Sequence, residues 1–195
     1  MTDLERNKAE PCRDQILRDL PHLEIEARPV DALQVLDKLL RFNLIIDATG
    51  EEALSIAINH YTVRHGPSFP PILYSWLEGN GSIARALLCD GAEHACYKCE
   101  KPELAGPPRH RAVKSETDLQ LDSNAPCGDG LFVTFPVSRS ASAAALGLEL
   151  ALAWANGKPE PRFRNLVLDA AQAYKVKDSN PGPSTACPAC QAAAA

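Results

Sequence analysis

Two Cys-x-x-Cys pairs constrain the fold of this chain more than any other feature. The first pair is Cys96 and Cys99, the second is Cys187 and Cys190, and residues 100–186 separate them. A two-residue gap lets one tight turn direct two thiolates at a single ion, and two such turns complete a tetrahedral zinc site. The spacing alone leaves two interpretations open, a shared metal site or unrelated buried or redox-active thiols. If the pairs share one ion, they hold the last part of the chain against its middle.

The composition is that of one folded domain, or one domain with a small appendage. The 195 residues are 45% hydrophobic and 23% charged, and the formal net charge is −5. No basic stripe is present that would bind nucleic acid or an anionic membrane surface. The first residues are polar, and the most apolar stretch, 131–154, is interrupted by charged residues and proline, so we expect neither a signal peptide nor a membrane span. Seven cysteines without a secretory signal favour a reducing compartment, and we expect a cytoplasmic protein.

Helical and strand patterns alternate in the first half of the chain. The patterns predict a helix from residue 7 to about 20, a strand over 23–27, a helix over 31–40, a strand over 44–46 and a helix over 51–61. Strands and helices at this spacing indicate crossover units, so we expect an α/β fold with a mainly parallel sheet. Asp47 follows the apolar strand, at the edge of the sheet where open α/β folds bind ligands. The alternative is that Asp47 caps the helix that follows.

The second half of the chain is more varied. Strand patterns at 72–76 and 82–88 flank the turn residues 78–81 and predict a hairpin. The remaining predictions are an irregular segment over 100–130, a helix over 137–155, and closing strands over 162–168 and 172–177. We expect a single domain over 1–191 and a disordered tail at 192–195.

Cys127 is distinct from both pairs. It lies in the segment Ala125-Pro126-Cys127-Gly128-Asp129-Gly130, where the glycines favour an exposed and mobile backbone. An exposed thiol in such a segment is suited to nucleophilic catalysis. The alternative is an ordinary loop cysteine without a role.

Four segments of the chain resemble the ThiF/MoeB and ubiquitin-activating-enzyme superfamily of ATP-dependent adenylyltransferases. They occur in the order of that family and span nearly the whole chain: Asn7-Lys8-Ala9-Glu10, Leu44-Ile45-Ile46-Asp47-Ala48-Thr49-Gly50, Cys96-Tyr97-Lys98-Cys99-Glu100-Lys101-Pro102-Glu103 and Cys187-Pro188-Ala189-Cys190. The resemblance implies a Rossmann-like fold. It also implies that ATP activates the C-terminal carboxylate of a ubiquitin-like protein or sulfur carrier as an acyl-adenylate, which many members then pass to a cysteine.

The resemblance assigns roles to individual residues. Lys8 matches the lysine that contacts the ATP phosphates, and Asp47 matches the aspartate that orients Mg²⁺. Cys127 lies where the acyl-accepting cysteine is expected. The two Cys-x-x-Cys pairs then form one structural zinc site, which we call the cysteine clasp (Cys96, Cys99, Cys187 and Cys190). Domains of this family commonly pair, so the resemblance also implies a homodimer.

Two departures from the family pattern limit these expectations. The Gly-rich nucleotide loop of the family lies upstream of the lysine motif, but only seven residues precede Lys8, and no Gly-x-Gly-x-x-Gly occurs in the chain. We therefore expect the C-terminal portion of a ThiF-type fold, as a fragment, a chain with a mis-called start, or one half of a split enzyme. In addition, Gly50-Glu51-Glu52 follows Asp47, where the family often has Asp-Asn.

Two other functions remain open at this point. One is a non-catalytic, zinc-stabilised interaction module or partner subunit, in which the helix from Val137 packs against another protein. The other is a nicotinamide-dependent oxidoreductase, because Asp-Ala-Thr-Gly after a strand also occurs in dinucleotide-binding folds. The missing Gly-rich turn and the paired cysteines argue against the oxidoreductase.

Overall fold

The computed structural model describes residues 7–91, 93–115, 121–122 and 132–194. The chain divides into two compact units, Met1–Asp37 and Lys38–Ala195, and each is described by itself. In the first unit, α1 (Ala9–Asp19) confirms the first predicted helix, and the Asn7 side chain accepts a hydrogen bond from the Ala9 amide at 3.0 Å.

The next two predictions were less accurate. The strand expected over 23–27 is wrong, because this segment has irregular backbone. An alternating pattern makes a strand only where a neighbouring strand accepts its hydrogen bonds, and none lies beside it among the described residues. The helix expected over 31–40 is the 3-10 helix η1 (Ala32–Arg41), interrupted by the non-helical backbone of Val35.

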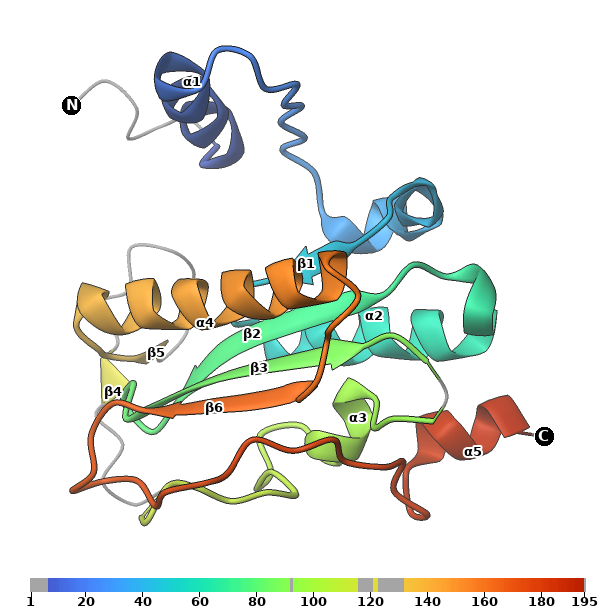
Figure 1. Cartoon of the computed structure of the whole chain (residues 1–195), viewed down its shortest axis with the longest axis vertical. Coiled ribbons are helices and arrows are strands. Elements are labelled where there is room, and N and C mark those ends of the chain that lie inside the picture. Colours follow the sequence, from blue (N-terminus) through green and yellow to red (C-terminus); the bar gives the residue numbers. More distant parts are fainter. Residues whose placement is uncertain (1–6, 92, 116–120, 123–131, 195) are drawn as a thin grey trace. The chain divides into compact units, whose positions relative to one another are not determined.

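A four-stranded sheet is the centre of the second unit (Figure 1). Its order is β1-β2-β3-β6, formed by β1 (Ile45–Asp47), β2 (Ile72–Glu78), β3 (Ile83–Cys89) and β6 (Phe163–Val167). Only β1 and β2 run parallel, connected through a helix, whereas β2–β3 and β3–β6 are antiparallel. The α/β class is confirmed, but the expectation of a mainly parallel sheet is wrong, because the hairpin and the returning β6 reverse the direction of the chain.

The β2–β3 hairpin confirms the prediction from turn chemistry. Gly79, Asn80 and Gly81 all have positive φ, which glycine and asparagine tolerate best. This turn sets the register in which Trp76 pairs with Arg85 and Glu78 with Ile83.

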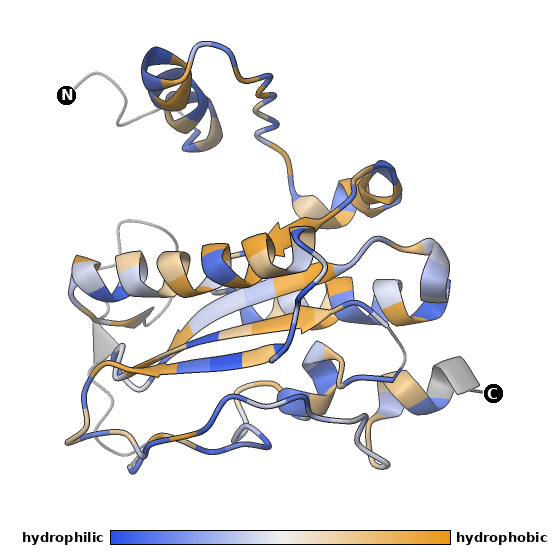
Figure 2. Cartoon of the chain, viewed as in Figure 1, coloured by the Kyte–Doolittle hydropathy of each residue, from blue (hydrophilic) through white to orange (hydrophobic). Residues whose placement is uncertain are grey.

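Two helices cover opposite faces of the sheet (Figure 1). Helix α4 (Val137–Ala155) has the predicted bounds and packs on one face, whereas α2 (Glu52–His65) lies behind the other. Figure 2 shows hydrophobic residues along β1 and β3. The core beneath α4 contains Leu73, Ala86, Leu88, Leu150 and Ala151, with Leu44, Leu146 and Trp154 packed against it.

Gly147 lets α4 approach the sheet closely. A Cβ at this position would lie 3.3 Å from the Ser75 hydroxyl oxygen, and that hydroxyl donates to the Ala143 carbonyl at 3.0 Å. The small-residue face of the helix predicted by the sequence therefore packs against β2.

Short elements complete the second unit. These are η2 (Gly66–Ser68), α3 (Tyr97–Glu100), β4 (Leu121–Asp122), β5 (Phe132–Val133) and α5 (Pro188–Ala194). The closing strand expected over 172–177 is wrong, since only an isolated bridge joins Ala173 to Val113.

The domain boundaries expected from the sequence, 1–191 for the single domain and 192–195 for the tail, remain predictions. Among the helices of the described segments, none is long and apolar enough to cross a membrane.

Candidate functional site

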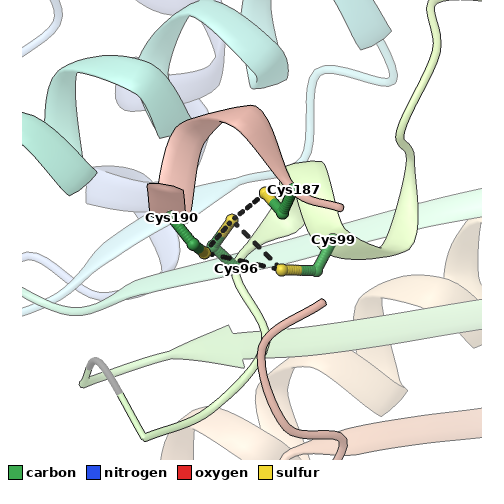
Figure 3. Close-up of side chains that lie close together, drawn as sticks. All are labelled: Cys96, Cys99, Cys187 and Cys190. Carbon is green, nitrogen blue, oxygen red and sulfur yellow. Dashed lines mark hydrogen bonds between the residues drawn. The ribbon is translucent and has the colours of Figure 1, made fainter. Parts of the chain in front are cut away.

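The four cysteines of the clasp meet at one point (Figure 3). Their sulfurs all lie within 4.8 Å of one another, with Cys96 Sγ at 3.7 Å from Cys99 Sγ, 3.7 Å from Cys187 Sγ and 3.5 Å from Cys190 Sγ. A tetrahedral ion with zinc–sulfur bonds of ~2.3 Å separates its sulfurs by about 3.8 Å. The four sulfurs therefore fit one four-coordinate metal ion.

Two helix starts present these sulfurs. Cys96 precedes α3, and the Cys99 amide donates to the Cys96 carbonyl at 2.9 Å, which closes the first turn. Cys187 precedes α5, where Pro188 takes the first helical position, favoured because proline has no N–H to satisfy there. Each two-residue gap is thus one turn of helix, and the clasp joins α5 to α3.

Burial makes the clasp a poor place for unpaired thiolates. Cys96, Cys99 and Cys187 are buried, and Cys190 is half-buried. The hydrogen bond from the Cys96 thiol lowers the pKa of Cys99 to about 5, while the same bond and burial raise the pKa of Cys96. Burial raises the pKa of Cys190 to about 12. A bound dication removes this conflict, because it stabilises all four thiolates together.

Asp47 ends β1 and its side chain is almost completely buried. One carboxylate oxygen accepts hydrogen bonds from the Thr49 amide at 3.1 Å and the Thr49 hydroxyl at 2.7 Å. The other accepts from the Ser55 hydroxyl of α2 at 2.6 Å. The N-cap of α2 is Glu51, so the capping alternative for Asp47 is wrong. Three donors leave one of about four lone-pair positions available to a ligand.

A pocket of about 110 Å³ opens beside Asp47. Its wall includes the aromatic side chains of two tyrosines and a tryptophan, and Glu52 and Lys101 of the lining are paired at 3.2 Å. The complete lining is Asp47, Gly50, Glu52, Ser55, Tyr74, Ser75, Trp76, Leu77, Glu78, Tyr97 and Lys101. Its carboxylates are suited to a cation or to hydrogen-bond donors.

The structure does not relate the other two predicted site residues to this pocket. Lys8 is the N-cap residue of α1 and belongs to the first unit, which is described by itself. Cys127 lies outside the described residues. Within the second unit, the structure therefore places only Asp47 and the four cysteines.

Sequence reasoning missed a buried charged group behind the pocket. Arg85 has no exposed surface, and its Nη2 lies 3.0 Å from Glu78 Oε2 and donates to the His110 carbonyl at 2.6 Å. Glu100 is also buried and contacts the His110 ring at 2.5 Å. Burial lowers the pKa of Arg85, and the nearby carboxylates of Glu78 and Glu100 oppose this effect. The only signal in the sequence is an arginine within the apolar strand Ile83-Ala84-Arg85-Ala86-Leu87.

Comparison with known proteins places this fold in a class. No protein-family model matches the chain. Over 95% of its length, the chain superposes on MccB of E. coli with a TM-score of 0.64 and 17% identity, covering 50% of that chain. The structure of MccB with ATP gives 0.64 at 16% identity, and that of the microcin C7 biosynthetic enzyme MccB with N-formylated MccA gives 0.63 at 17% identity. At this identity, the likeness concerns the fold.

A relative in sequence is more specific. The chain is 40% identical over 189 residues to the ATP-dependent ubiquitin transferase-like protein Cap2 of Pseudomonas aeruginosa. The match covers 96% of this chain and 33% of Cap2, so the chain spans about a third of that relative and half of MccB. The resemblance to the ThiF/MoeB and ubiquitin-activating-enzyme superfamily is confirmed.

Proposed function

We propose that this chain supplies part of the active site of an ATP-dependent enzyme that activates the C-terminus of a ubiquitin-like or sulfur-carrier protein. The observation that carries the proposal is the place of Asp47. Its carboxylate ends a strand that runs parallel to its neighbour, lines a pocket and keeps acceptor capacity, within a fold similar to that of MccB. Ligands of open α/β folds bind at this edge of the sheet.

In this proposal the cysteine clasp holds a structural zinc ion. The fit rests on the sulfur separations, on the four-thiolate donor set and on the burial of three of its members. A closed four-cysteine site leaves no position for substrate, so its binding energy contributes to folding. The ion would hold α5 against α3, which begins with the pocket residue Tyr97 and is followed by the pocket residue Lys101.

The proposed reaction has two steps. A carboxylate oxygen of the carrier attacks the α-phosphorus of ATP, and pyrophosphate leaves. The Cys127 thiolate then attacks the acyl carbonyl, and AMP leaves with the electrons of the broken bond. In the first step Asp47 would orient Mg²⁺, which neutralises phosphate charge, and Lys8 would contact the phosphates. Because the chain has no Gly-x-Gly-x-x-Gly, a further segment would supply the backbone amides that hold the phosphates.

A chimera tests the proposal. This chain replaces the matched third of Cap2, and the assay measures exchange of labelled pyrophosphate into ATP in the presence of an added ubiquitin-like or sulfur-carrier protein. We expect carrier-dependent exchange, which Asp47→Asn lowers about 100-fold, since lost metal positioning is worth several kcal/mol. Asp178→Asn is the matched control, because the Asp178 carboxylate also accepts a hydrogen bond from a backbone amide, that of Asn165. We expect this variant to keep the exchange rate.

Cys127→Ala separates the two steps. We expect this variant to keep pyrophosphate exchange and to lose the reducible thioester with the carrier. Exchange that survives Asp47→Asn would show that the Asp47 pocket is not the adenylation site, and transfer that survives Cys127→Ala would refute the acyl-carrier role.

A second candidate is a non-catalytic partner subunit, and the surface of α4 favours it. Val137, Leu148 and Leu152 are 85%, 58% and 53% exposed, which suits a helix that packs against another protein. The family resemblance makes a second copy of the chain the first partner to test. Carrier binding by the chimera without any pyrophosphate exchange would favour this candidate.

A further inference from the structure

Helix α2 carries polar residues on the face that it buries. Glu52, Ser55 and Asn59 are spaced by three and four residues, which places them along one side of the helix. Ser55 is 6% exposed and Asn59 only 1%, although helices usually bury apolar side chains there. We call these three residues the polar stripe. Its two ends contact different parts of the site.

Asn59 contacts the cysteine clasp. Its Nδ2 donates to Cys96 Sγ at 3.4 Å, and its Oδ1 accepts from the Tyr97 amide at 2.9 Å. Both ends of the amide are therefore used, and together they fix the sulfur and the backbone of the first Cys-x-x-Cys turn. An N–H group directed at a metal-bound thiolate also offsets part of its negative charge, which matters in a buried site with four thiolates.

The other end of the stripe contacts the Asp47 pocket. The Ser55 hydroxyl donates to Asp47 at 2.6 Å, and Glu52 pairs with Lys101 at 3.2 Å. Lys101 follows α3, the turn that carries Cys99, and its amide donates to the Tyr97 carbonyl at 2.9 Å. The pocket and the clasp thus share one helix, α2, and one short turn, α3.

We propose that Asn59 positions Cys96 for the metal ion and that, through the polar stripe, metal occupancy sets the geometry of the Asp47 pocket. The inference rests on the zinc clasp proposed above. Without the ion, the four close sulfurs lose the charge that holds them together, so Cys96 moves and Asn59, which is hydrogen-bonded to it, moves with it. Because the residues of helix α2 move together, this displacement reaches Ser55, one turn away. The hydrogen bond from the Ser55 hydroxyl then passes the displacement to the Asp47 carboxylate.

Metal affinity tests the first half of this proposal. Asn59→Asp keeps the shape and the acceptor for Tyr97, but it replaces the donor to Cys96 with a carboxylate oxygen. We expect zinc affinity, measured by competition with a chromogenic chelator, to fall roughly 10- to 100-fold. Asn156→Asp, the same change at the exposed end of α4, leaves the affinity unchanged. In Co²⁺-loaded protein, the sulfur-to-cobalt charge-transfer bands shift in Asn59→Asp and not in the control.

Hydrogen exchange of the unaltered full chain tests the second half and needs no variant. Removal of zinc by a chelator should increase amide exchange in 47–59, while β3 and α4 stay protected. Unchanged exchange in 47–59 would overturn the coupling, and so would an equal increase in all elements, which indicates global unfolding.

The outcomes also separate this inference from the proposed function. A purified chain that binds no zinc defeats the proposed clasp. A chain that binds zinc equally well with and without Asn59→Asp defeats only the role of Asn59.

Discussion

Replacement of Arg85 by methionine should destabilise this protein strongly. Arg85 has no exposed surface, and its guanidinium lies 3.0 Å from Glu78 Oε2, in a side chain that is 10% exposed. Methionine fills a similar volume but leaves the carboxylate buried without its cation, and the His110 carbonyl loses a donor at 2.6 Å. Breaking a buried ion pair in this way costs about 3–5 kcal/mol. Arg85 also lies over the Phe163 ring at 5.4 Å, and this contact is lost too.

The unfolding free energy in urea, followed by circular dichroism, measures this cost. For a chain of this size, the expected loss lowers the melting temperature by roughly 6–20 °C. A matched control is Arg28→Met, which removes an exposed arginine from Glu26 at 2.7 Å and should leave the stability almost unchanged.

A double variant identifies the cause. Arg85→Met with Glu78→Gln removes both charges, and the glutamine can still accept from the Trp76 indole, which donates to Glu78 at 2.8 Å. We expect the double variant to be more stable than Arg85→Met, because the uncompensated carboxylate accounts for most of the loss. A loss below about 1 kcal/mol in Arg85→Met, or a double variant less stable than the single one, would refute this reasoning.

Two further predictions concern the phenol in the pocket and the clasp. Burial raises the pKa of the Tyr74 phenol well above its ordinary value, whereas an unfolded tyrosine ionises near pH 10. The unfolded chain therefore releases a proton that the folded chain retains, so stability falls as the pH rises above about 10. Tyr74→Phe should reduce this fall in urea titrations between neutral pH and pH 11, and an unchanged slope would contradict the assignment. Removal of the metal ion proposed for the clasp, or Cys187→Ser, should release α5 and make the chain after β6 sensitive to protease, whereas Cys12→Ser, at an exposed position, should not. Equal digestion of both variants would show that the clasp does not hold α5.

Several elements follow from short stretches of sequence, because their causes are local. Glycines and asparagine at the turn produce the β2–β3 hairpin, and helix-favouring small residues produce α4 with the predicted bounds. The predicted strand over 23–27 fails for the opposite reason, since a strand depends on a partner that no local pattern supplies. The same argument applies to the orientation of the sheet, which only the pairing of β3 with β2 and β6 decides.

The sequence by itself determined which residues are able to bind a metal ion, since Cys-x-x-Cys spacing is a property of a single turn. It also placed Asp47 at the end of the strand that becomes β1. Only the tertiary structure decided that the two cysteine pairs meet, that Ser55 reaches Asp47, and that Asn59 touches the clasp. The cysteine pairs, and Asn59 with Cys96, are far apart in the chain, and the packing of α3 and α5 against α2 brings them together. Arg85 shows the same limit, because a buried charge is tolerated only where folding supplies its partners.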